Sequence, residues 1–98
     1  MEITLEKLRR GTQEYLDALE GKGLSRSTFN VYARNLSYMN SYFEHEAGRR
    51  GITPGDVADF RDHVEAKYKN ATAINIIGIT NRLFRFMHEE RFCIKNIR

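Results

Sequence analysis

Apolar side chains recur every three or four residues along most of the chain, which is the spacing of one face of an α-helix. The clearest stripe has intervals of three and four and comprises Phe29, Tyr32, Leu36, Met39 and Phe43. The sequence contains one proline, Pro54, so long stretches are free of helix breakers. This pattern predicts an all-α fold.

Capping residues divide the pattern into four helices. We expect them over residues 4–21, 25–44, 53–68 and 70–91. Thr53, Pro54 and Asp56 give the third helix a capping hydroxyl, a proline at its first position and a carboxylate in its first turn. The β-branched run at residues 74–79 has no second strand to pair with, so we predict helix there as well.

Short connections between four such helices predict a small four-helix bundle that forms a single domain over residues 1–98. Gly11 and Gly78 lie inside predicted helices, where they indicate close helix contacts. Ile79 is expected between the two faces of the fourth helix. The face of that helix opposite the core is expected to carry Asn75, Gly78, Arg82, Arg85 and Glu89.

Composition places the chain among ordinary globular proteins, with 41% hydrophobic and 30% charged residues. No apolar stretch approaches the roughly 20 residues that a membrane span needs, and the N-terminus lacks the pattern of a signal peptide. The single cysteine, Cys93, cannot form an internal disulfide. We therefore expect a cytoplasmic protein.

Charge is unevenly distributed along the chain, and this favours an anionic partner. The net charge of +3 is the sum of −1 over residues 1–23, +2 over 24–50, −1 over 51–69 and +3 over 70–98. Positive charge is therefore concentrated in the second and fourth of these segments, which is typical of a protein that binds nucleic acid.

Signals for catalysis and metal binding are weak. Three histidines and Cys93 have none of the close paired spacings of a zinc site. Neither a phosphate-binding glycine loop nor a nucleophile elbow occurs. We expect no cofactor, no metal and no catalytic residue in this chain.

The second and fourth helices offer candidate DNA contacts, because free N–H groups and the dipole at a helix N-terminus attract phosphate. The candidates at the two helix starts are Lys22, Arg26, Ser27, Thr28, Lys69, Asn70 and Thr72. Groove contacts are expected from the exposed face of the fourth helix, at Asn75, Arg82 and Arg85. Ser25 and Asn70 also fit simple helix caps. The basic surface equally suits an acidic protein partner, and a small enzyme subunit is a more distant alternative.

Motifs over essentially the whole chain resemble the core-binding, SAM-like domain of tyrosine recombinases, the phage integrase family. The run at residues 22–32, KGLSRSTFNVY, is similar to the glycine-leucine-serine, threonine, tyrosine pattern that opens the second helix of that domain. Ile52 and Thr53 are similar to the signal before its third helix. The segments that resemble its last helix and exit are residues 70–72, 83–87 and 94–96. Asn75 departs from the family, since many members have a basic residue there.

This resemblance implies a DNA-binding module that closes over duplex DNA as half of a clamp, with the second and fourth helices facing the DNA. It also implies a following catalytic domain beyond Arg98 and other recombinase protomers as partners, so that this chain alone is inactive. The nucleophilic tyrosine would belong to the catalytic domain. We therefore expect packing roles for most of Tyr15, Tyr32, Tyr38, Tyr42 and Tyr68.

Overall fold

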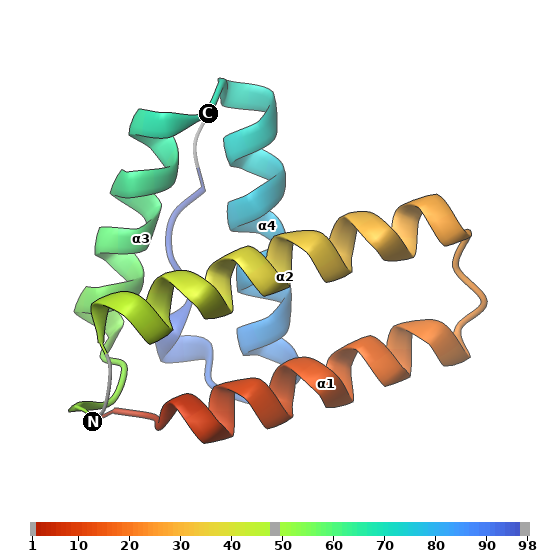
Figure 1. The fold of residues 1–98 in the computed structure, drawn as a ribbon, viewed down its shortest axis with the longest axis horizontal. Helices are drawn as coiled ribbons and strands as arrows, with labels where there is room; N and C mark the ends of the chain where they lie inside the picture. The colour runs from red at the N-terminus through yellow and green to blue at the C-terminus, as the bar shows by residue number, and fades with distance from the viewer. Residues whose placement is uncertain (1, 48–49, 97–98) are drawn as a thin grey trace.

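The computed structural model describes residues 2–47 and 50–96, so residues 48 and 49 of the connection after the second helix lie outside it. The elements are α1 (Leu5–Gly21), α2 (Arg26–Glu46), α3 (Pro54–Lys67), α4 (Asn70–Phe86) and the 3-10 helix η2 (Glu90–Phe92). α1 and α2 lie side by side and antiparallel, and α3 and α4 run across them (Figure 1). The predicted four-helix, all-α fold is confirmed.

The first three helices begin at the positions that their capping residues predicted. Thr4 accepts a hydrogen bond from the Lys7 N–H at 3.0 Å, and Ser25 accepts one from the Thr28 N–H at 3.2 Å. α2 continues two residues beyond its predicted end, to Glu46. The predicted stripe on α2 is buried at Leu36, Met39 and Phe43 and only partly buried toward its start.

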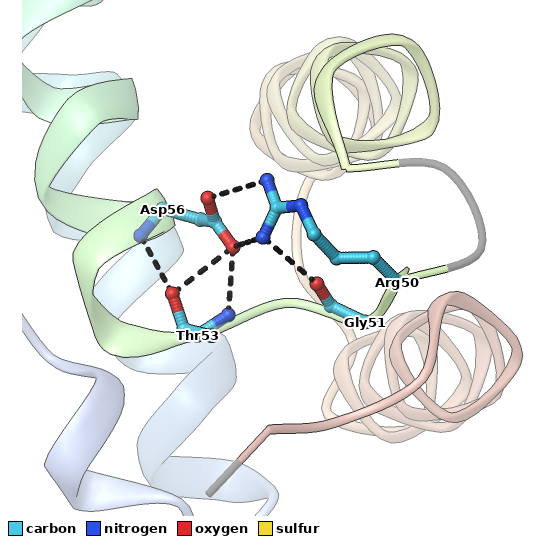
Figure 2. Close-up of polar contacts among 4 residues, drawn as sticks. All are labelled: Arg50, Gly51, Thr53 and Asp56. Carbon is cyan, nitrogen blue, oxygen red and sulfur yellow. Dashed lines mark hydrogen bonds and ion pairs between the residues drawn. The ribbon is translucent and has the colours of Figure 1, made fainter.

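The start of α3 is the most completely capped helix end (Figure 2). Thr53 Oγ1 accepts from the Asp56 N–H at 3.2 Å, while Asp56 Oδ2 accepts from the Thr53 N–H at 2.9 Å. Arg50 donates to both oxygens of the same carboxylate, at 2.9 and 3.0 Å. The Arg50 hydrogen bond, followed by those from Thr53, keeps the pKa of Asp56 below its usual value.

α4 is the central helix of the fold, because α1, α2, α3 and η2 all pack against it. The β-branched run at residues 74–79 is helical, as predicted. Ile79 is only 3% exposed, so its expected position between two faces was wrong. The buried side of the helix is formed by Ala73, Ile76, Ile77, Ile79, Thr80, Asn81, Leu83 and Phe84.

The end of α4 differs from the prediction, which extended it to residue 91. The helix ends at Phe86, and His88 takes a left-handed conformation with φ 60° that turns the chain back. This reversal stacks Phe92 against Phe84, with ring centroids 5.3 Å apart. Burial of an aromatic ring on the core therefore outweighs continuation of the helix.

Glu89 was predicted on the exposed face of this helix, and the reversal buries it instead, at 7% exposure. Its Oε2 accepts a hydrogen bond from Lys7 Nζ at 2.6 Å, so the start of α1 is joined to the end of the α4 region. Arg91 lies 2.9 Å from Oε1, close enough for an ion pair but not aligned for a hydrogen bond. The contact with Lys7 lowers the pKa of Glu89, and burial opposes this effect.

The segment after η2 runs back along α4 between α4 and α3 (Figure 1). The buried amide of Asn81 holds it, donating to the Ile94 carbonyl at 2.7 Å and accepting from the Ile94 N–H at 2.9 Å. Arg61 of α3 donates to the Lys95 carbonyl at 2.6 Å, and Asn96 donates to the Ile74 carbonyl at 3.3 Å. We call residues 93–96 the exit segment; it covers one edge of α4.

The pairing of Glu89 with Lys7 predicts a pH-dependent contribution to stability. Glu89→Gln is expected to lower the free energy of unfolding by about 1–2 kcal/mol at pH 7, since Lys7 is half exposed and its attraction is partly screened. The folded pKa of Glu89 lies below the unfolded value of about 4.3, so this contribution is complete above that pH and is lost as pH falls through the folded pKa. Urea unfolding should therefore show a smaller difference in the free energy of unfolding between parent and variant at about pH 2.5 than at pH 7. An equal difference at both pH values would contradict the assignment.

Candidate nucleic-acid interface

Packing on α4 leaves one narrow strip of its surface exposed. After the first turn of the helix, the exposed residues are Asn75, Arg82, Arg85 and Phe86. The first three, together with the partly exposed Gly78, follow at spacings of three, four and three residues, which places them on one helix face. We call Asn75, Gly78, Arg82 and Arg85 the α4 strip. Its members were predicted as the outward face, and their exposure agrees.

The seven candidates at the helix starts are also exposed: Lys22, Arg26, Ser27, Thr28, Lys69, Asn70 and Thr72. Ser25 caps α2 through its hydroxyl, as the simpler alternative predicted. Asn70 does not cap α4, because it is the first helical residue and Lys69 occupies the N-cap position without a side-chain hydrogen bond. The first amides of α4 are therefore left without a capping side chain, in the arrangement that suits an anion.

The structure separates the two helix starts rather than joining them into one site. In Figure 1 the start of α2 lies at the far end of the α1–α2 pair, and the start of α4 lies beside the end of α3. The α4 strip is bordered by the exit segment on one edge, and on the other Arg82 lies near Tyr15 of α1. Burial raises the pKa of the Tyr15 hydroxyl, and the positive charge of Arg82 opposes that rise.

A groove of about 230 Å³ lies where α2 crosses the first half of α4. It brings Thr72, a predicted site residue, together with Arg34 of α2, which the candidate set lacked. The signal for Arg34 was present in the sequence, since it lies four residues after Asn30 and eight after Arg26 on the polar side of α2. The remaining lining residues are Asn35, Tyr38, Tyr68 and Ile76.

Ion pairs divide the basic side chains into two groups. Several near the start of α1 and around α3 are neutralised, in the pairs Lys7–Glu89, Arg9–Glu44, Arg50–Asp56 and Arg61–Glu65. Within residues 2–47 and 50–96, the other group has no carboxylate partner within 4.0 Å; it includes Lys22, Arg26, Arg34, Lys69, Arg82 and Arg85. The remaining unpaired cations of the described residues are Arg10 on α1, Lys67 on α3 and Lys95 after η2, so most of the unneutralised positive charge lies on α2, α4 and the turns before them.

The outer side of α3 carries exposed acidic side chains. Asp59, Asp62 and Glu65 are exposed on α3, as predicted for the outer side of that helix. α3 lies on the side of α4 away from the start of α2 (Figure 1). The exposed carboxylates of α3 thus lie away from the basic start of α2.

The tyrosines have packing roles. Tyr15 contacts Tyr32 and Phe86, with ring centroids 6.3 and 5.1 Å apart. Tyr38 and Tyr42 both pack on Phe60, and Tyr38 also contacts Tyr68. Burial, with the Tyr68 hydrogen bond, raises the pKa of Tyr38 to about 12, which disfavours the phenolate that a nucleophile needs.

The described residues hold neither a metal cluster nor a membrane-spanning helix. No group of three or more His, Cys, Asp or Glu side chains there is arranged to hold a metal ion. No helix in that part of the chain is both long and apolar enough to cross a membrane.

A known protein family matches most of the chain, including the candidate interface. The family of the phage integrase N-terminal SAM-like domain matches residues 12–91, which include all ten candidate residues and the three helices α2, α3 and α4 in full. The chain belongs to this family. The resemblance inferred from the motifs is therefore confirmed, and the integrase domain has the expected all-α architecture. No solved structure matches the chain.

Proposed function

We propose that this integrase domain binds duplex DNA through α2 and α4 and acts as one half of a clamp for strand exchange. The observation that carries the proposal is the division of charge. Basic side chains on α2 and α4 are exposed and lack carboxylate partners among the described residues, whereas most of those near α3 and the start of α1 are paired, Arg10 and Lys67 being the exceptions. Exposed cations without internal partners suit a polyanion, because each can neutralise a phosphate and release a counterion.

Phosphate contacts are assigned to the helix starts and to the middle of α2. The uncapped first turn of α4 offers backbone N–H groups beside Lys69, Asn70 and Thr72. Arg34 joins this set, because it shares the groove at the α2–α4 crossing with Thr72. The corresponding contacts at the start of α2 are assigned to Lys22, Arg26, Ser27 and Thr28.

Groove contacts are assigned to the α4 strip. Asn75, Arg82 and Arg85 carry amide and guanidinium groups, which bind base edges as well as phosphates. The packed sides of α4 leave this strip as the part of the helix that can approach DNA after its first turn. A rigid, buried helix is a suitable support for such contacts, since little conformational entropy remains to be lost on binding.

The rest of the clamp is assigned to the catalytic part of the integrase and to other protomers on the same DNA. With half of the clamp, this domain should bind duplex DNA at roughly micromolar affinity or weaker, as in non-specific binding. The alternative is an interaction module for an acidic protein. A large exposed apolar patch would favour that alternative. Among the described residues, the exposed large hydrophobic side chains are Leu24 and Phe86, each at 38%, and two such residues do not make a large patch.

Removal of two charges from the α4 strip tests the proposal. Arg82→Ala combined with Arg85→Ala should change the free energy of unfolding by less than about 0.5 kcal/mol, since both side chains are exposed. DNA affinity should fall, and the slope of log K against log salt should become shallower by up to about two units. Fluorescence anisotropy over a salt series and thermal melts on the same samples give both readouts.

A control of equal charge removes two cations from a helix that is not assigned to the DNA surface. Arg9→Ala combined with Arg10→Ala also removes two exposed cations, from the first half of α1. This control should bind DNA nearly as well as the parent. Equal losses in the two double variants would show that only net charge matters, and unchanged binding in the α4 variant would refute the assignment of that strip.

Strand cleavage is assigned to a part of the integrase outside this domain. The 98-residue chain should neither relax supercoiled plasmid nor form a covalent adduct with DNA, because its tyrosines pack in or against the core and the proposed chemistry belongs to another part of the integrase. Gel analysis of plasmid topology and of protein–DNA adducts measures this. Reproducible adduct formation by the purified chain would place a nucleophile inside this domain and contradict the proposal.

A further inference from the structure

Gly78 is the one glycine among the described residues that lies in a helix interior without a packing reason. A Cβ at Gly11 would lie 2.6 Å from Met87 Sδ, so the Met87 side chain packs directly on this glycine and the predicted close contact is present. A Cβ at Gly78 would meet only Asn96 Nδ2 at 3.6 Å and Arg82 NH1 at 3.7 Å, which are ordinary contacts with flexible side-chain ends. The close helix contact expected at Gly78 is therefore absent.

The other described glycines have different explanations. Gly23 and Gly51 have φ of 75° and 90°, which favour glycine. Gly21 is the last residue of α1, and Gly55 lies in the first turn of α3. Glycine costs less stability at the end of a helix than in its interior. Gly78 instead occupies the ninth position of a 17-residue helix, where glycine is less stable than alanine. Gly78 therefore makes the helix less stable than alanine would, and no packing contact within the domain explains why glycine is present.

The surroundings of Gly78 point to a partner that approaches the helix backbone. Gly78 lies in the α4 strip between Asn75 and Arg82, both exposed. An α-helix has a Cα radius of about 2.3 Å, against about 5–6 Å with side chains, so a glycine leaves a depression in its surface. The Arg82 guanidinium flanks this depression with N–H donors, while the Asn96 amide nitrogen on its other side donates to the Ile74 carbonyl. Donors around a depression suit an anionic oxygen.

We propose that Gly78 forms a notch in α4 that seats a phosphodiester group of duplex DNA beside Arg82. This inference rests on the proposed function, and it names the place at which the DNA backbone comes closest to α4. A methyl group at residue 78 would hold the DNA backbone away from the helix and weaken its contact with Arg82. The notch is thus a contact that a substitution can block without removing any charge.

Gly78→Ala in the 98-residue chain separates this role from a role in folding. The melting temperature should rise by roughly 2–8 °C, since alanine favours the helix and its Cβ meets only ordinary contacts. The Kd for a short duplex should nevertheless increase about 5- to 10-fold, the loss of one charge-assisted contact. The salt slope should become shallower by about one unit. Gly78→Leu, which projects farther, should weaken binding more than alanine does.

Gly55→Ala is the matched control, because its added Cβ would lie 3.6 Å from Thr53 Oγ1, also an ordinary contact, on the acidic α3 side. It should bind DNA within about twofold of the parent. Unchanged binding by Gly78→Ala and Gly78→Leu, with salt-dependent binding of the parent, would overturn the notch but leave the proposed function intact. A lower melting temperature for Gly78→Ala would also overturn it, by revealing a role in folding. If the parent shows no salt-dependent binding, both proposals are wrong.

Discussion

The burial of α4 is the constraint on which the rest of the structure depends. Every other element packs against this helix, and the exit segment, tied down by Asn81, covers one of its edges. After the first turn, four residues of α4 remain exposed, and three of them are Asn75, Arg82 and Arg85. Because the apolar sides of the helix must be covered, its polar side chains are restricted to one strip. The geometry of the candidate interface is thus a consequence of how the core is filled.

Charge adds a second level of organisation to this arrangement. Carboxylates neutralise basic side chains near the start of α1 and around α3, where Glu89 and Asp56 accept hydrogen bonds from Lys7 and Arg50. The same carboxylates stabilise the fold, since one joins chain segments distant in sequence and the other caps α3. The cations of α2 and α4 have no such structural role, and this difference is the physical basis for assigning them to a polyanionic partner.

Periodicity and capping predicted most of the fold, because they are local properties. Thr4, Ser25 and the Thr53–Asp56 pair marked helix starts correctly, and the exposure of Asn75, Arg82 and Arg85 followed from their shared helix face. The end of α4 was not predictable in this way, since it depends on the stacking of Phe92 on Phe84 and on the contact of Glu89 with Lys7, 82 residues away. Arg34 was missed for a related reason: its proximity to Thr72 arises from the crossing of two helices.

The central claim is that one side of the domain, formed by α2 and α4, meets DNA. The most direct test is a titration of the isotope-labelled chain with a short duplex, followed by two-dimensional amide NMR. The largest shift changes should fall at residues 22–28 and 69–75 and around Arg34, Arg82 and Arg85, with little change along α3. Changes confined to α3 or to the first half of α1, or no changes on addition of DNA, would contradict the account.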